Sequence, residues 1–382
     1  MLLSKFIDRL KGRLHAPVLA ISVVLFAMPN PAAAQDGPAG PPPFIEGEIS
    51  FELQNDHAFD SDDPSAEIND LFTTIEAALA LNLTEVFSVQ SLFVLEPVRD
   101  PTPFDDRNFE DHGLYVEELY AQAQFDMFRI FAGKFDASFG TAWDAAPGIY
   151  GTDFAEDYEL VERIGGGFAI TAMQTGFGDV TLTTNVFFAD TSALSESAFT
   201  NRGRNRRALG GASNTNSLES FSITLDGENV PMVSDLTYHV GFRHQAAGVG
   251  DAGDEYGVVA GLQKSFDLGN DAAFETIVEG VYLNNGFGGP DDVVYFTAGG
   301  AFITGPWNLS TSFTLRDTDV VGGPDVSDHL AQVSAGYSFD FGLTADAGYR
   351  YSREDGVETH IFGLLFTYTY DVGAGLNMLA GR

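Results

Sequence analysis

The 382-residue sequence contains no cysteine, few basic residues and no apolar run long enough for a membrane-spanning helix. Without cysteine the chain forms no disulfide bond and carries no acylated cysteine of the lipoprotein type. The sequence has 19 Lys and Arg and 55 Asp and Glu, which gives a net charge of −36. So acidic a protein repels phosphates, and nucleic acid is therefore not expected as a partner.

The N-terminal segment has the layout of a secretory signal peptide. Four basic residues precede an apolar run from Ala16 to Met28, and three alanines end at Ala34. We expect residues 1–34 to be a signal peptide cleaved after Ala34. Removing them takes away four basic groups and one acidic group, which leaves a net charge of −39. Residues 35–43, which include "GPAGPPP", are predicted to be a Pro/Gly-rich periplasmic lead-in.

The first segment after this lead-in, "FIEGEISFELQ" at 44–54, alternates strictly in polarity. As a strand it places Glu46, Glu48 and Glu52 on the face opposite Ile45, Ile49, Phe51 and Leu53. A sheet with one solvated face explains this pattern. A transmembrane barrel strand, with lipid on one face and a water-filled lumen on the other, also explains it, and one strand does not decide between the two.

Similar alternation recurs along the rest of the chain and predicts sixteen strands. We therefore expect an all-β fold, a transmembrane antiparallel β-barrel over 44–371, followed by a C-terminal tail at 372–382. Long and short connections alternate, which predicts short periplasmic turns and long external loops. The predicted strands centre on 44–54, 71–82, 86–97, 113–124, 127–136, 160–173, 179–189, 217–226, 235–245, 255–266, 273–284, 292–303, 306–317, 329–339, 342–352 and 358–370.

The stretch "EELYAQAQFDMFRIFAGKFDASFG" and the acidic loop after it resemble the central part of Gram-negative outer-membrane porins, including the phosphate-selective branch. The resemblance implies a sixteen-stranded channel, usually a homotrimer, whose third external loop folds into the lumen. Two features depart from the pattern. The chain continues past its last aromatic strand into "GAGLNMLAGR", and it is acidic where phosphate selectivity would need a basic lumen.

By chain order, residues 137–159 form this third external loop. Trp143, Tyr150 and Phe154 are candidates for fixing it to the wall. One interpretation is a solvated surface loop; the other is a pore constriction whose carboxylates attract cations, because a low-dielectric wall concentrates their field. The predicted constriction residues are Asp144, Asp153, Glu156 and Asp157.

Alternation also predicts the side chains of the pore wall. We expect the acidic residues Glu46, Glu48 and Glu52 to face a basic set across the lumen, although each arginine could equally form a local ion pair or lie at the rim. The predicted basic residues are Arg129, Arg163, Arg243, Arg316 and Arg350.

The expected function is passive diffusion of small hydrophilic solutes and ions, with cations preferred, through an outer-membrane pore. Outer-membrane lipid and lipopolysaccharide are expected partners, and "NRGRNRR" at 201–207 could contact lipopolysaccharide phosphates or remain a solvated loop. The alternatives are a substrate-selective channel or receptor, an adhesin and an outer-membrane hydrolase. No catalytic motif is found, so no enzyme activity, cofactor or metal site is predicted.

Overall fold

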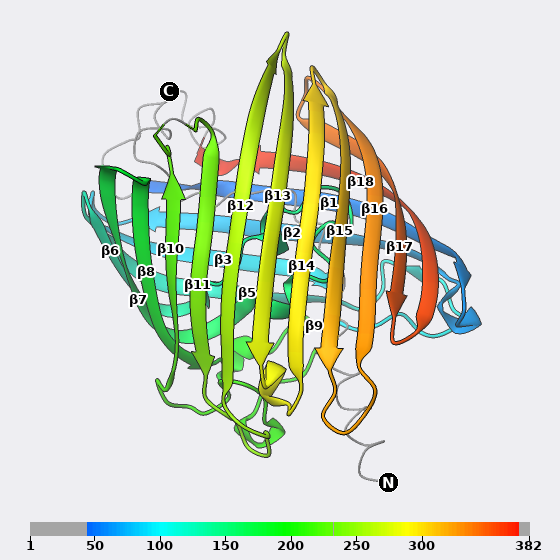
Figure 1. Ribbon diagram of the computed structural model, residues 1–382, viewed down its shortest axis with the longest axis horizontal. Coiled ribbons are helices and arrows are strands. Elements are labelled where there is room, and N and C mark those ends of the chain that lie inside the picture. Colours follow the sequence, from blue (N-terminus) through cyan, green and yellow to red (C-terminus); the bar gives the residue numbers. More distant parts are fainter. Residues whose placement is uncertain (1–43, 232, 374–382) are drawn as a thin grey trace.

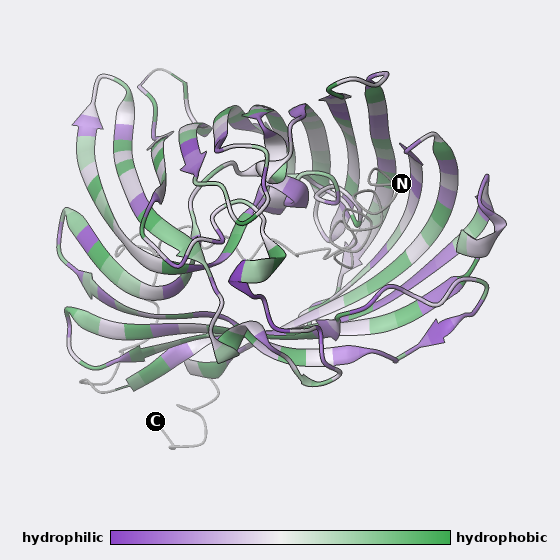
Figure 2. Cartoon of the chain, turned by 90° about the horizontal axis from the view of Figure 1, so that it is seen from below, coloured by the Kyte–Doolittle hydropathy of each residue, from purple (hydrophilic) through white to green (hydrophobic). Residues whose placement is uncertain are grey.

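The computed structural model describes residues 44–231 and 233–373, which form one closed antiparallel β-barrel of sixteen long strands. The barrel closes because β1 (Phe44–Ser61) pairs with both β2 (Asn69–Asn82) and β18 (Val357–Asp371). Figure 1 shows the tilted strands from the side, and Figure 2 shows them as a ring with chain segments inside it. The other long strands are β3 (Phe87–Pro97), β5 (His112–Gln124), β6 (Phe128–Ala137), β7 (Leu160–Thr175), β8 (Gly178–Ala189), β10 (Ser220–Glu228), β11 (Leu236–Gln245), β12 (Glu255–Gly269), β13 (Ala272–Asn284), β14 (Asp292–Thr304), β15 (Trp307–Asp319), β16 (Val326–Ser338) and β17 (Leu343–Glu354).

Short elements occupy the connections between these strands. β4 pairs with β2, and β9 pairs with β5. Across 44–231 and 233–373, no helix has the length and apolar character needed to cross a membrane. The short elements are β4 (Arg107–Asn108), β9 (Ala198–Phe199), α2 (Ala142–Ala145), η1 (Pro64–Ala66), η2 (Glu156–Tyr158), η3 (Ala193–Ser195), η4 (Arg207–Leu209) and η5 (Gly286–Gly288).

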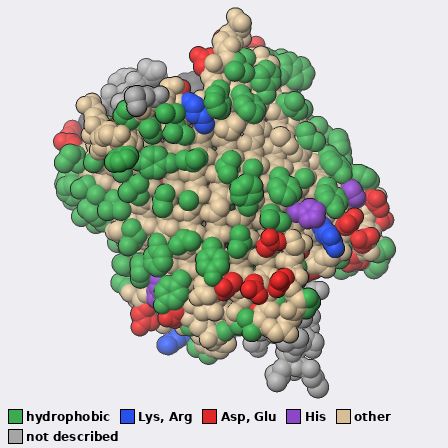
Figure 3. Space-filling view, in the orientation of Figure 1, with side chains coloured by type: hydrophobic (Ala, Val, Ile, Leu, Met, Phe, Trp, Pro, Cys, Tyr) green, Lys and Arg blue, Asp and Glu red, His purple; other side chains and the backbone are tan. Residues whose placement is uncertain are grey.

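Polarity alternates between the two faces of the barrel wall. On β11, Val240 and Phe242 are 51% and 37% exposed on the outer face, whereas His239 and Arg243 are 3% and 1% exposed on the inner face. Apolar side chains cover the middle of the outer face seen in Figure 3, and acidic side chains gather towards the end that carries the loops after β13 and β15. An apolar outside and a polar inside are typical of a barrel that stands in lipid.

The predicted fold class is confirmed, and each of the sixteen predicted segments overlaps one long strand. β1 is longer than predicted because residues 55–57 continue the ladder with β2, and the ladder with β18 continues to Ser61 past an irregularity between Ala58 and Asp60. The segment "LYVEELYAQAQF", which alternates poorly, contains a β-bulge: Val116 and Glu118 pair with consecutive residues of β3, which leaves Glu117 as the extra residue.

The alternation of long and short connections holds from β1 to β17, although the difference is smaller in the second half of the barrel, where 246–254, 285–291 and 320–325 alternate with 270–271, 305–306 and 339–342. The connections at 98–111, 138–159 and 190–219 are long, but that at 355–356 has two residues although it lies at the same end. The predicted signal peptide 1–34, the lead-in 35–43 and all but the first two residues of the predicted tail 372–382 lie outside the described residues.

Candidate functional site: an inner loop and an acidic wall

Residues 138–159, which connect β6 to β7 and are called the inner loop below, pack against the inner face of the barrel. The backbone N–H of Gly140 donates a hydrogen bond to His239 Nε2 on β11 at 3.0 Å. The Tyr150 hydroxyl donates to Asp56 on β1 at 2.6 Å. These contacts join the loop to strands far from β6 and β7 around the ring.

Glu279 on β13 is the most heavily used anchor of the inner loop. Its Oε2 accepts hydrogen bonds from the N–H and the hydroxyl of Thr141, at 2.8 and 2.9 Å. Its Oε1 accepts from the N–H of Ala142 at 3.0 Å and from the Tyr158 hydroxyl at 2.7 Å. One buried carboxylate thus fixes both the start of α2 and the end of η2.

Three of the predicted wall arginines also hold the inner loop. Arg316 on β15 pairs with Asp157 at 2.8 Å, and Arg350 on β17 pairs with Asp153 at 2.7 Å. Arg243 on β11 donates to the backbone carbonyl of Tyr158 and pairs with Glu255 at 2.7 Å. Each of these three arginines therefore has a specific partner. The pairs Arg316–Asp157 and Arg350–Asp153 join residues that are more than 150 positions apart in the sequence.

Small wall residues allow the inner loop to approach the barrel closely. A Cβ added to Gly363 on β18 would lie 1.9 Å from the Tyr150 hydroxyl oxygen, and one added to Gly299 on β14 would lie 2.6 Å from Pro147. Of the aromatic residues expected to fix the loop, Tyr150 and Phe154 are buried, and Trp143 donates to the backbone carbonyls of Phe139 and Gly140. Side chains of the loop also form part of the hydrophobic core inside the barrel.

The four predicted constriction residues therefore have different surroundings. Asp153 and Asp157 face arginines; burial raises the pKa of Asp153 to about 7 although Arg350 lowers it. Glu156 accepts a hydrogen bond from the Thr152 hydroxyl at 2.7 Å, and burial raises its pKa well above the usual range. Burial also raises the pKa of Asp144 to about 6. Among the described residues, no side-chain partner is found for the Asp144 carboxylate.

The predicted acidic wall residues lie along β1. Glu46 and Glu48 are exposed near the start of the strand, and the Asn82 amide donates to Glu46 at 2.7 Å. Glu52 is buried on the inner face. The remaining two arginines lie on β6 and β7 beside aromatic rings, Arg129 over Phe131 and Arg163 over Phe187.

A second group of acidic residues, which the sequence analysis did not identify, lies on the wall near the inner loop. Glu76 on β2 and Glu117 and Glu118 on β5 are only partly buried. Burial raises the pKa of Glu159 at the end of the loop well above its usual range, and repulsion from Glu117, Asp144, Glu118 and Glu76 raises it further. The five carboxylates are thus close enough to interact. The alternation along 71–82 could have identified Glu76, because it places this residue on the same face of the strand as Phe72 and Thr74.

The basic segment 201–207 is packed in part against the barrel. Arg202 pairs with Glu162 and lies over the ring of Tyr115, with its guanidinium carbon 3.7 Å from the ring centre. Arg204 donates to the backbone carbonyl of Thr191, and Arg206 and Arg207 are exposed. Lipopolysaccharide binding by this segment stays a prediction.

Comparison with solved structures supports the barrel fold. The chain is similar to the outer membrane channel DcaP of Acinetobacter baumannii, with a TM-score of 0.56 and 11% identity over 86% of this chain and 96% of that one. It is similar to OprB of Pseudomonas putida, with a TM-score of 0.61 and 9% identity over 85% of this chain and 94% of that one. A third similar structure is OccK2 of Pseudomonas aeruginosa in complex with glucuronate, with a TM-score of 0.51 and 10% identity over 86% of this chain and 98% of that one. No family model matches the chain, and no curated protein does.

Proposed function

We propose that the protein is an outer-membrane porin through which small hydrophilic solutes diffuse passively, with cations preferred. The closed sixteen-stranded barrel with an apolar outer face supports this proposal. Similar barrels include a structure described as an outer membrane channel. In this proposal the inner loop narrows the lumen, and solutes pass between the loop and the wall formed by β2, β3 and β5.

The carboxylates on the two sides of this passage carry the proposal of cation preference. Asp144 and Glu159 come from the inner loop, and Glu76, Glu117 and Glu118 come from the wall. Because its pKa is raised, Glu159 adds more to the field as the pH increases. A narrow passage with low-dielectric walls concentrates the field of like charges and raises the local concentration of cations. Asp153 and Asp157 contribute less to this field because arginines pair with them.

This assignment changes the roles expected for the constriction. Asp144 and Glu159 are proposed to set the preference for cations. Asp153 and Asp157 are proposed to anchor the loop instead. Glu46, Glu48 and Glu52 remain proposed wall residues, and they add negative charge along β1. Arg129 and Arg163 remain proposed wall residues beside the passage.

Solute flux into liposomes tests the channel function itself. Liposomes that contain the purified protein should swell in isotonic solutions of small sugars and amino acids, at rates that fall as the solute becomes larger. Liposomes without protein should not swell. Swelling that is limited to one solute would favour the alternative of a substrate-selective channel, and no swelling with any solute would contradict the proposal.

A further inference from the structure

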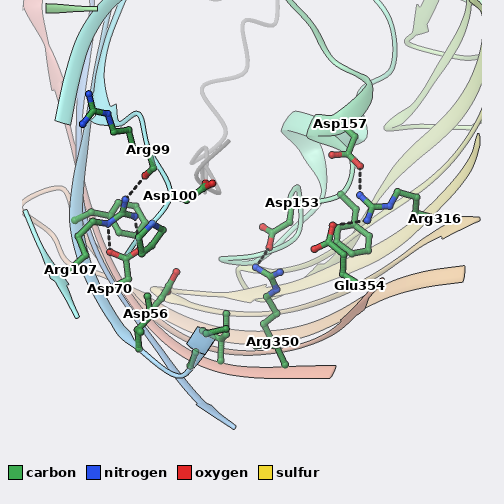
Figure 4. A pocket seen from close by; sticks show the side chains of 18 residues that line it. Asp56, Asp70, Arg99, Asp100, Arg107, Asp153, Asp157, Arg316, Arg350 and Glu354 are labelled. Carbon is green, nitrogen blue, oxygen red and sulfur yellow. Dashed lines mark hydrogen bonds and ion pairs between the residues drawn. The ribbon is translucent and has the colours of Figure 1, made fainter. Parts of the chain in front are cut away.

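A cavity of about 290 Å³ lies inside the barrel beside the inner loop. It is bounded by the inner loop, by residues 99–101, and by β1, β2, β15, β17 and β18 (Figure 4). This volume lies near the lower end of the range for small-molecule sites. The cavity is separate from the group of Glu76, Glu117 and Glu118, which do not line it.

The buried guanidinium groups of the cavity already have carboxylate partners from the protein. Arg107 Nε binds Asp70 at 2.7 Å. Arg316 pairs with Asp157 of the inner loop, and Arg350 pairs with Asp153. Arg99 is exposed and bonds to the backbone carbonyl of Asn201 at 3.1 Å. An anionic ligand would therefore compete with carboxylates that are already in place, which lowers its affinity.

Asp56 differs from the other buried acids of the cavity because neutral groups bind its carboxylate. Oδ1 accepts from the Tyr150 hydroxyl at 2.6 Å, and both oxygens are within 3.1 Å of the Gln54 amide nitrogen. In Figure 4 its carboxylate points towards the open space between the Arg107 side and the Arg350 side. A ligand cation would form a charge-assisted hydrogen bond there without displacing a basic residue.

Apolar side chains form much of the remaining surface. A hydrated inorganic cation gains nothing from such walls, whereas an alkyl chain is stabilised by leaving water. The apolar lining residues are Ala58, Ala66, Ile68, Phe72, Pro101, Phe154 and Ile361.

We propose that this cavity binds a small organic ammonium ion, with the ammonium group on Asp56 and a short alkyl body against the apolar walls. This inference rests on the proposed function, since it names a class of solute that the channel holds beside its passage. Its site is distinct from the carboxylates proposed to set ion selectivity.

Saturation-transfer difference NMR on the full-length protein in detergent, at pH 8, tests the site without relying on conduction. The probe is n-butylammonium chloride, and 1-butanol is the neutral probe of similar size. Butylammonium should show saturable binding and butanol should not. Asp56→Asn, which keeps an acceptor for the Tyr150 hydroxyl, should weaken butylammonium binding about tenfold or more. Ala58→Leu, which fills the cavity but keeps its charges, should abolish binding.

Asp60→Asn is the matched control, because Asp60 lies on the same strand and outside the cavity lining. Circular dichroism melting confirms that each variant is folded. Equal butylammonium binding by the unmodified protein and folded Asp56→Asn, or equal binding of butanol, would overturn the inference. Failure of the porin proposal shows separately, as the absence of potassium chloride conductance in a planar bilayer.

Discussion

At the scale of single residues, acidic side chains inside the barrel differ in the partners that they bind. Glu279 accepts four hydrogen bonds from the inner loop, and Asp153 and Asp157 pair with arginines. Asp144 lies on the same loop but contacts no basic group among the described residues. In our proposal, acidic residues therefore fix the loop in one place and attract cations in another.

Replacing Glu279 by alanine should loosen the inner loop, because the N–H groups of Thr141 and Ala142 and the Tyr158 hydroxyl lose their acceptor. We expect the free energy of unfolding to fall by about 2–4 kcal/mol and open-channel current noise to increase. Urea titration and single-channel recording measure the two effects. Glu275→Ala on the same face of β13, where the side chain is exposed, should change neither. Equal effects of the two substitutions would show that Glu279 is not a special anchor.

The cation preference should depend on pH through Asp144. Burial raises the pKa of this residue to about 6, so its carboxyl group is mostly neutral at pH 5 and mostly charged at pH 7. The ratio of cation to anion permeability should therefore increase as the pH rises through 6. Asp144→Asn should lower the ratio at pH 7 and flatten its change between pH 5 and pH 7. If Asp144→Asn keeps the full pH dependence, Asp144 does not contribute to the preference for cations.

At the scale of structural elements, the inner loop takes its position from the wall as much as from its own sequence. Tyr150 reaches Asp56 only because Gly363 leaves space for its hydroxyl. Next to the buried Tyr150, the backbone N–H of Ile149 donates to the Ser334 hydroxyl on β16 at 3.2 Å. The loop and the wall are therefore one packed unit.

Gly363→Ala tests this packing. The new Cβ would lie 1.9 Å from the Tyr150 hydroxyl oxygen, so the tyrosine must move and its bond to Asp56 is lost. We expect a loss of about 1–3 kcal/mol in the free energy of unfolding and a change in single-channel conductance. Gly280→Ala is the control, because its added Cβ would have no neighbour nearer than 4.0 Å. Unchanged stability and conductance in Gly363→Ala would contradict the observed position of the loop.

The strands could be predicted from the sequence because lipid and water impose opposite polarities on alternate residues. The same alternation correctly predicts that Arg243, Arg316 and Arg350 lie on the inner face. It could not identify their partners, since the pairing of Arg316 with Asp157 depends on how a long loop folds across the ring. It also could not reveal the role of Glu117, because the β-bulge in β5 interrupts the alternation there.

At the scale of the whole molecule, the long loops lie at one end of the barrel and the acidic groups of the inner loop lie within it. If the long loops are external, trypsin added to intact cells should cleave after the exposed residues Arg206 and Arg207 in the connection 190–219. Mass spectrometry identifies the released ends. Cleavage on intact cells after Lys264, which lies towards the other end, would reverse the proposed orientation.

The reversal potential in a planar bilayer with a potassium chloride gradient tests the central claim most directly. The unmodified protein should give the sign of a cation-preferring pore, because carboxylates of the inner loop lie near those of β2 and β5. The double variant Asp144→Asn and Glu159→Gln should move the potential towards zero, whereas Asp60→Asn and Asp62→Asn, near the exposed first loop, should move it much less because salt screens distant charges. A reversal potential of the opposite sign, or equal shifts in the two double variants, would contradict the account.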